Sequence, residues 1–278
     1  MDPMDLLYGG VLQCAEAATF GMPFEVWKTH MGTFRNEGNL ESFRNIYKKG
    51  GVTAFWKGWQ PKMVESFLKG GLLIFAKDGI IRSSKAAGFS EVTSGLLGGF
   101  GGGCAQVVVL GPCTYLITAK VAERAGEAMS MTARIKSTWE TAGITGFYRG
   151  GFALMLRQGS NWASRQGLTD AVRAIFKARH SGEKNPRLSI AEEAISGTIG
   201  GALSVWNQPF EVLRIEAQSA AARGLAKKNI VETAKQIFAE SGFLGFYQGS
   251  GPRAGLCVVQ TQFMITIPYI LAGLKNKD

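Results

Sequence analysis

Charged side chains stand inside several stretches of this sequence that are otherwise apolar, and their types indicate what they could bind. Glu65 is followed one helical turn later by Lys69, and Arg157 and Arg253 stand in two further stretches of this kind. Charge in an apolar segment is costly and usually faces a water-filled cavity or a partner. An arginine guanidinium holds a carboxylate through two parallel hydrogen bonds, and lysine adds positive charge. Three cations with one acid therefore predict binding of an anion such as a di- or tricarboxylate.

Glu65 does not favour an anion and needs another role. It can hold Lys69 through an ion pair of i, i+4 spacing, hydrogen-bond a substrate hydroxyl group, or carry a proton with a protonated substrate. Lys62, close before Glu65, is a further candidate cation. For Lys62 and Arg253, an equally good interpretation is that the long side chain reaches the membrane surface or contacts lipid.

Residues for covalent or metal chemistry are scarce. The only histidines are His30 and His180, and the four cysteines stand singly in apolar stretches with no paired spacing. No glycine-rich nucleotide-binding motif is present. The sequence therefore predicts that the protein is not an enzyme, with no catalytic residue, no metal site and no chemical cofactor.

The composition excludes disordered and fibrous chains, because 46% of the 278 residues are hydrophobic and the 37 glycines follow no triplet period. The 31 basic residues exceed the 21 acidic residues by 10, which fits an anionic substrate, anionic lipid or nucleic acid. No basic and aromatic nucleic-acid module is present, so we expect no nucleic-acid partner. A mean hydropathy close to zero, together with so many glycines, fits a membrane protein with a wet interior.

One pattern occurs three times along the chain. Each copy begins with a proline. Farther on it has the pattern Gly-x4-aromatic-x-Gly, where x is any residue, and we call this pattern the aromatic–glycine signal. The prolines are Pro23, Pro112 and Pro209, and the signals run from Gly51 to Gly58, from Gly143 to Gly150 and from Gly242 to Gly249. The chain is therefore predicted to hold three tandem repeats, residues 1–88, 89–188 and 189–278, within one transmembrane domain.

Each repeat has two long apolar stretches, each sufficient for the roughly 20 residues that span a bilayer. They cover residues 6–32, 61–83, 92–123, 152–178, 190–221 and 253–274. Shorter segments at 40–49, 132–142 and 229–241 carry apolar residues at helical spacing between charges, as helices on a membrane surface do. The predicted fold class is an all-α membrane protein with two transmembrane helices and one short surface helix per repeat.

The repeated blocks resemble the mitochondrial carrier family over essentially the whole chain. The proline blocks read PFEVWK and PFEVLR, and the signals end in WKG, YRG and YQG. Three shorter blocks, VESFLKG from residue 64, RQGSNW from 157 and LSVWNQP from 203, are similar to the citrate/oxoglutarate carriers of that family. The resemblance implies a pseudo-threefold bundle of six helices around one substrate site that opens alternately to the two sides of the mitochondrial inner membrane. It also implies that both chain ends lie in the intermembrane space.

The resemblance assigns the proline blocks to a gate on the matrix side. The three prolines kink the odd-numbered helices, and the charged residues after them close the gate by ion pairs. The first and third repeats keep both charges, in Glu25, Lys28, Glu211 and Arg214. The second repeat has Thr114 and Ile117 instead, so at most one pair between these helices can form. Gln218 can brace that pair by a hydrogen bond.

The resemblance also implies a cytoplasmic gate and lipid sites. The gate residues would be Asp78, Asp170 and Arg173. Lipid headgroups, notably of cardiolipin, are implied at helix N-termini beside the signals, where backbone amides favour anions. The glycines concerned are Gly51, Gly58, Gly143, Gly150, Gly242 and Gly249.

The resemblance implies that substrate is contacted at the level of the residue seven positions after the last glycine of each signal. Counting from the three signals gives Glu65, Arg157 and Leu256. The full predicted substrate site is Glu65, Lys69, Arg157, Gln158, Asn161, Arg253 and Leu256. Its substrates would be small anionic carboxylates.

Two functions from different classes fit these observations. The first is an exchanger of di- and tricarboxylates, with citrate for 2-oxoglutarate as the best match. The second is a carrier-fold structural or lipid-binding subunit of a larger inner-membrane complex with little or no transport, which the uncharged gate of the second repeat suggests. An amino-acid or nucleotide carrier is a third alternative, but the excess of cations argues against a plain amino-acid site. If the chain transports, a gate with few ion pairs predicts easy interconversion and some leak.

Overall fold

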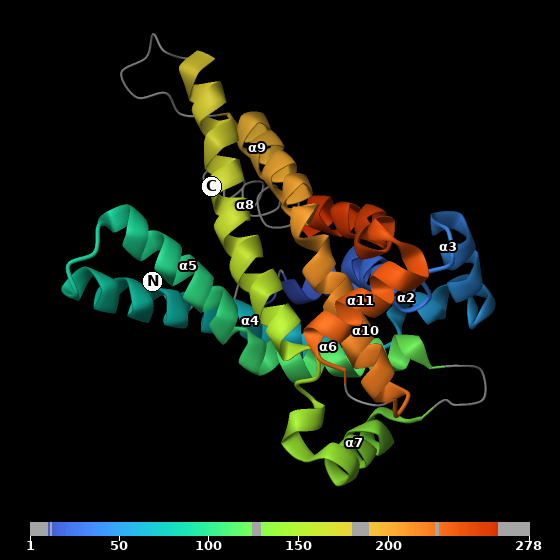
Figure 1. Cartoon of the computed structure of the whole chain (residues 1–278). Coiled ribbons are helices and arrows are strands. Elements are labelled where there is room, and N and C mark those ends of the chain that lie inside the picture. Colours follow the sequence, from blue (N-terminus) through green and yellow to red (C-terminus); the bar gives the residue numbers. More distant parts are fainter. Residues whose placement is uncertain (1–10, 12, 124–128, 180–188, 226–227, 261–278) are drawn as a thin grey trace, which may run out of the picture.

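The computed structural model describes residues 11, 13–123, 129–179, 189–225 and 228–260. These residues form helices and turns with no strand among them, so the fold is all-α (Figure 1). The elements are η1 (Ala17–Gly21), α2 (Met22–Thr33), α3 (Asn39–Lys48), η2 (Gly51–Trp56), α4 (Trp59–Ala86), α5 (Glu91–Ala105), α6 (Val107–Ala122), α7 (Met131–Gly146), α8 (Gly151–Arg179), α9 (Ile190–Leu203), η3 (Ser204–Asn207), α10 (Gln208–Ala222), α11 (Ile230–Ser241) and η4 (Phe243–Tyr247). A last described helical segment covers residues 251–260.

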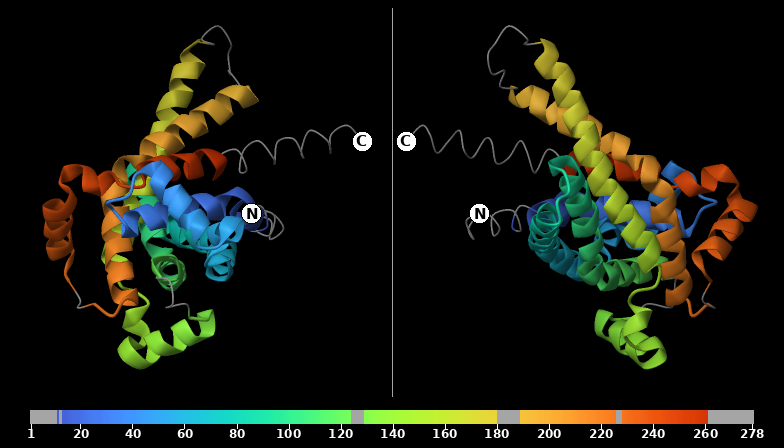
Figure 2. Two further views of the ribbon diagram at one scale, coloured as in Figure 1. Left: turned by 90° about the vertical axis from the view of Figure 1, so that its right-hand side faces the viewer. Right: turned by 60° about the vertical axis from the view of Figure 1, so that its left-hand side comes forward.

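The three helices that hold the repeated prolines, α2, α6 and α10, contact one another near the middle of the molecule (Figure 1). Helices α4 and α5 lie side by side, and so do α8 and α9. The α8–α9 pair extends beyond the rest of the described helices (Figure 2). The side chains that follow the prolines are therefore brought together at the centre.

Two of the short helices bury one face against a proline helix, as their spacing of apolar residues predicts. In α3, Ile46 packs with Met22 and with other buried side chains of α2. In α11, Ile237 packs against Val212 and Leu213 of α10. The remaining faces of these two helices carry charged and exposed residues. These contacts hold α3 against α2 in the first repeat and α11 against α10 in the third.

Each repeated proline is preceded by a break in regular helix geometry. The π-helical turn η1 comes before Pro23, α5 and α6 meet at Gln106 before Pro112, and the 3₁₀ turn η3 comes before Pro209. A proline removes one backbone donor and its ring crowds the preceding turn, so the distortion falls on the N-terminal side. No single described helix combines the length and apolar composition of a membrane span, whereas one pair bent by 47°, Leu97–Ala105 with Val107–Ala122, does so together.

The aromatic residues of the first two signals bond to the carbonyl groups that these prolines leave without a donor. Tyr148 donates its hydroxyl hydrogen to the carbonyl of Val108, at 2.8 Å, and Val108 stands four residues before Pro112. Trp56 donates its indole N–H to the carbonyl of Ala18, at 2.7 Å. Ala18 is five residues before its proline, the spacing of the π-helical turn. In these two signals the aromatic side chain therefore acts as a hydrogen-bond donor.

We expect Trp56→Phe and Tyr148→Phe each to lower the free energy of unfolding by about 1–2 kcal/mol, because each leaves a helix carbonyl without its donor. The control is Tyr247→Phe, because the Tyr247 hydroxyl has no hydrogen bond among the described residues. Thermal unfolding of the purified variants in detergent, followed with a thiol-reactive dye that reports exposure of the cysteines, would test this. An equal loss in all three variants would contradict the assigned bonds.

The second glycine of each signal touches the proline helix of the next repeat. A methyl group added at Gly58 would stand 3.1 Å from the Cα of Ile117, one at Gly150 would stand 3.0 Å from the carbonyl oxygen of Arg214, and one at Gly249 would stand 3.0 Å from that of Lys28. All three glycines have positive φ, between 70° and 80°. Both the conformation and the close approach exclude a side chain there. The contacts run from the first repeat to the second, from the second to the third, and from the third to the first.

The segment after α2 is tied to the third repeat by Arg35. Its guanidinium forms an ion pair with Glu216 of α10, at 2.6 Å, and another with Glu240 of α11. A hydrogen bond from Gln236 and the Arg35 guanidinium lower the pKa of Glu240. Gln248 also donates to the carbonyl of Arg35, at 3.1 Å. These bonds join the segment after α2 in the first repeat to α10, α11 and the signal of the third repeat.

Candidate functional site

A cavity of about 480 Å³ lies between the helical residues 13–16, the helices α2, α4, α6, α8 and α10, and the helical segment at 251–260. All seven residues predicted to bind substrate line it: Glu65, Lys69, Arg157, Gln158, Asn161, Arg253 and Leu256. The four charged residues of the predicted matrix gate, Glu25, Lys28, Glu211 and Arg214, line the same cavity. The two predicted sites are therefore parts of one space.

The cations of this cavity differ in how far they are neutralised. The Lys69 ammonium has no hydrogen bond or ion pair with any described residue. Arg157 bonds to the neighbouring Gln158, and its Nε lies 3.4 Å from Glu211 without a hydrogen-bond partner of its own among the described residues. Arg253 donates to the side chains of Asn207 and Gln208, which are neutral. The cavity thus contains positive charge that the surrounding protein only partly compensates.

For Lys62 and Arg253, two interpretations were open: contact with substrate, or contact with lipid at the membrane surface. Lys62 and Arg253 are each only 3% exposed and both line the cavity, so neither side chain extends to the molecular surface. Asn207 and Gln208 are fully buried and support Arg253 from behind. Asn207 also donates to the carbonyl of Arg157, at 3.2 Å.

Of the three roles considered for Glu65, the ion pair with Lys69 is not formed in the structure. Glu65 pairs instead with Lys62, at 2.9 Å, which stands three residues before it on α4. Lys62 also lies 3.3 Å from Glu25 of α2, so it sits between two carboxylates and is held there. Both lysines have helical spacing from Glu65, and the second acid on α2 favours the pair with Lys62. Lys69 remains available as a result.

One ion pair joins the two proline helices that keep their charges. Lys28 of α2 lies 2.8 Å from Glu211 of α10 and 2.7 Å from Glu25 on its own helix. Arg214 donates two hydrogen bonds to Glu211, at 2.8 and 3.0 Å. It donates a third to Gln218, at 2.5 Å. Glu211, fully buried, is therefore the centre of the predicted matrix gate.

The second repeat enters the gate through neutral groups. Gln218 of α10 donates to the hydroxyl of Thr114 at 3.1 Å and accepts from Thr118 at 3.0 Å. Ile117 packs beside the first repeat and offers Glu25 no charge. Lys62 supplies that charge from α4 instead. The charged cluster at the predicted gate thus includes a residue outside the proline helices, which the sequence pattern did not reveal.

The predicted cytoplasmic gate is not defined by the structure. The side chains of Asp78 in α4 and Asp170 in α8 lie outside the described residues, while Arg173 lies in the described part of α8. The pairing of these residues therefore stays a prediction.

The cavity residues that were not predicted include the polar Gln13, Glu16 and Gln106. Glu16 is a buried acid in an apolar stretch, and that feature alone was a sufficient signal. It stands seven residues before Pro23, where the other two repeats have Ala105 and Ala202. A comparison of the repeats at this offset would have identified it.

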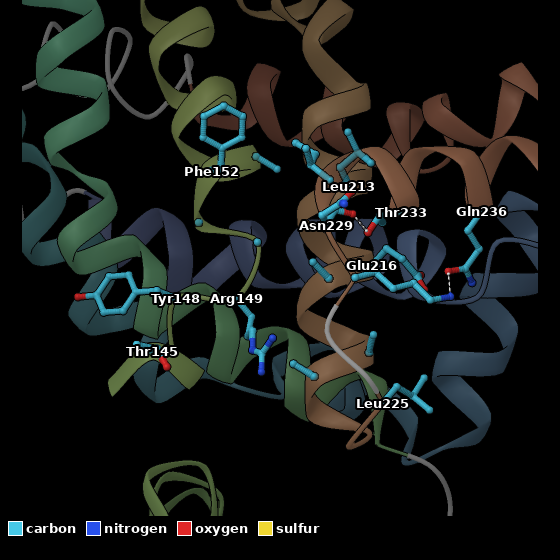
Figure 3. A pocket seen from close by; sticks show the side chains of 18 of the residues that line it. Thr145, Tyr148, Arg149, Phe152, Leu213, Glu216, Leu225, Asn229, Thr233 and Gln236 are labelled. Carbon is cyan, nitrogen blue, oxygen red and sulfur yellow. Dashed lines mark hydrogen bonds between the residues drawn. The ribbon is translucent and has the colours of Figure 1, made fainter. Parts of the chain in front are cut away.

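A second cavity, of about 840 Å³, lies where α8 begins, against α10 and α11 (Figure 3). Apolar groups of α10 line it together with Phe152, and the basic residues Arg149 and Lys228 are at its wall. Of the six glycines predicted to lie beside lipid, Gly150 lines this cavity. Two helices begin beside this cavity. At the start of α11 the side chains of Asn229 and Glu232 form a capping box that bonds to backbone amides, and α8 begins at Gly151, directly after Gly150.

Comparison with known proteins gives relatives along nearly the full length. The family described as mitochondrial carrier protein matches residues 2–85 and 186–268. The citrate/oxoglutarate carrier protein of Saccharomyces cerevisiae is 35% identical over 271 residues, which cover 94% of this chain and 86% of the relative. The tricarboxylate transport protein of the same yeast is 24% identical over 285 residues, or 96% and 94% of the two chains.

The mitochondrial tricarboxylate transport protein of Homo sapiens is 25% identical over 260 residues, which cover 90% of this chain and 80% of that protein. The similarity therefore spans the gate, the central cavity and the signals together. It agrees with an all-α chain whose three proline helices meet around a charged cavity. The chain belongs to the mitochondrial carrier family.

Proposed function

We propose that this protein exchanges di- and tricarboxylates, citrate for 2-oxoglutarate, across the mitochondrial inner membrane. The observation that carries the proposal is the positive charge of the central cavity. Among the described lining residues six are basic, namely Lys28, Lys62, Lys69, Arg157, Arg214 and Arg253, and four are acidic, namely Glu16, Glu25, Glu65 and Glu211. If all are ionised, two positive charges remain for an anionic substrate. The names of the relatives, which refer to citrate, oxoglutarate and tricarboxylates, favour the same substrate class.

Three groups are suited to hold the substrate. Lys69 has no ion-pair partner among the described residues and can bind one carboxylate. Arg157 can turn its planar fork from Gln158 toward another. Arg253 is oriented by two amide side chains, which leave its charge uncompensated. These cations lie on α4, on α8 and on the last described helix, so a small acid with several carboxylates can bridge all three.

Exchange by alternating access is supported by the position of the gate. Lys28 and Glu211 join α2 to α10 directly beside the cavity, and Arg214 with Gln218 adds α6 to the closure. We assign this closed end to the matrix side and both chain ends to the intermembrane space. Protease protection of tags at the two ends in intact mitochondria tests that orientation.

The second cavity is proposed to hold a cardiolipin headgroup. Its supports are an open helix start at Gly150, the cations Arg149 and Lys228, and the apolar wall (Figure 3). Native mass spectrometry of the protein with cardiolipin and with zwitterionic lipid would test it. Arg149→Ala is expected to weaken retention of cardiolipin, with Lys136→Ala, exposed on α7, as the control.

The deciding experiment for transport is uptake of labelled citrate by liposomes that contain the purified protein. The liposomes are preloaded with buffer, citrate, 2-oxoglutarate, malate, ATP or aspartate. We expect uptake to require internal citrate or 2-oxoglutarate. If no internal substrate supports citrate uptake, and thermal unfolding shows that the protein is folded, the proposed exchange function is contradicted. If the protein then purified together with an inner-membrane complex in a fixed stoichiometry, the alternative function as a structural subunit would be favoured.

A further inference from the structure

Glu16 differs from every other described acid of the central cavity because no cation bonds to it. Its side chain lines the cavity and the residue is 4% exposed. Its Oε1 is buried and has no hydrogen-bond partner among the described residues. A methyl group at Gly21 would stand 2.5 Å from this oxygen, so the glycine leaves the space that the carboxyl group occupies.

The other three acids are bonded to cations. Glu65 pairs with Lys62 at 2.9 Å, and Glu25 with Lys28 at 2.7 Å. Glu211 accepts from Arg214 and pairs with Lys28 as well. A carboxylate bonded to cations stays ionised, whereas burial without a partner favours the protonated form. Glu16 is therefore the acid of this cavity that is best suited to take up a proton.

Charged groups from two neighbouring helices face Glu16. Lys62, Lys69 and Glu65 do so from α4, and Glu25 does so from α2. Lys62 is already shared between Glu25 and Glu65, which leaves Lys69 as the cation not bonded to another described residue. A substrate carboxylate that binds Lys69 neutralises one of the two positive charges that favour the ionised form of Glu16. Anion binding and proton uptake by Glu16 are then coupled.

We propose that Glu16 is the proton-binding site that matches the cavity to substrates of different charge. The inference rests on the proposed exchange function. With Glu16 ionised, the net charge of the described lining residues equals that needed by a dianion such as 2-oxoglutarate. With Glu16 protonated, it matches the trianion of citrate. Citrate therefore crosses with one proton on Glu16, 2-oxoglutarate returns without it, and the exchange moves no net charge.

The test measures exchange in liposomes under an imposed pH gradient and, separately, under a potassium diffusion potential set with valinomycin. In the unmodified protein, one pH unit shifts the distribution of citrate against 2-oxoglutarate by about tenfold, and the potential has no effect. Glu16→Gln loses the pH dependence, and a tenfold potassium gradient then shifts its distribution by about tenfold. Exchange of citrate for itself, whose charge matches a neutral side chain at this position, still occurs in this variant, which shows that it is folded.

Two further variants separate a proton site from a structural role. Glu16→Asp keeps a carboxyl group and is expected to restore the pH dependence. Glu123→Gln removes another buried acid, one that lies outside the cavity and pairs with Lys120, and keeps the behaviour of the unmodified protein. Equal pH dependence in Glu16→Gln and the unmodified protein would overturn the proton site alone. Absence of all exchange by the unmodified protein would overturn the proposed function and this inference with it.

Discussion

Replacing Arg157 by alanine is expected to slow carboxylate exchange by roughly two to four orders of magnitude and to leave a folded protein. The side chain offers a substrate carboxylate two charge-assisted hydrogen bonds, each worth about 1.5–3 kcal/mol, so their loss removes about 3–6 kcal/mol. The fold tolerates the loss because Arg157 is only the most distant of three cations around Glu211, at 3.4 Å, while Lys28 and Arg214 lie at 2.8 Å.

Initial rates of labelled citrate uptake and thermal unfolding would be measured on the same preparation. Arg157→Lys keeps the charge but not the fork and should show an intermediate rate. Arg44→Ala, on the exposed part of α3, is the control and should behave like the unmodified protein. Uptake within about threefold of normal by folded Arg157→Ala would refute the assignment of Arg157 to the substrate site.

The second large effect is expected for Glu211→Gln, which should lower the free energy of unfolding by about 3–5 kcal/mol. The fully buried Glu211 lies among Lys28, Arg157 and Arg214, and its removal leaves buried cations uncompensated. The same change opens the ion pair between α2 and α10, so citrate efflux should no longer need an exchange partner.

Glu25→Gln is the matched control for this prediction. The cations of Glu25 have other acids, because Lys28 keeps Glu211 and Lys62 keeps Glu65. Its unfolding temperature should therefore fall much less. The four cysteines are half-buried or buried, so a thiol-reactive dye reports both transitions. A fall as large for Glu25→Gln as for Glu211→Gln would contradict the central position of Glu211.

The sequence was sufficient to predict where the main helices begin and bend, and which residues on α4, α8 and the last described helix line the cavity. The three signals and prolines mark where helices begin and bend, and counting from them reaches Glu65, Arg157 and Leu256, all of which line one space. These predictions depend on spacing along the chain, which helical geometry converts directly into position.

The partners of the charged residues could not be predicted in the same way. Glu65 has a lysine at helical spacing on either side, and the acid that decides between them, Glu25, is on another helix. The same holds for Lys62, whose role in the gate depends on the distance between α2 and α4. Whether an ion pair forms between two helices depends on the distance between the helices and on the direction of their side chains. Neither can be read from the sequence of one chain.

The three glycine contacts have a mechanical consequence for a chain whose second repeat has lost its gate charges. Gly58, Gly150 and Gly249 each press one repeat against the backbone of the next, and the series returns to its start. Because these contacts form a closed ring, a rotation of one repeat would push against the backbone of the next. If the repeats move during the proposed transport, the two repeats that hold ion pairs would therefore also constrain the second repeat, whose gate positions are neutral.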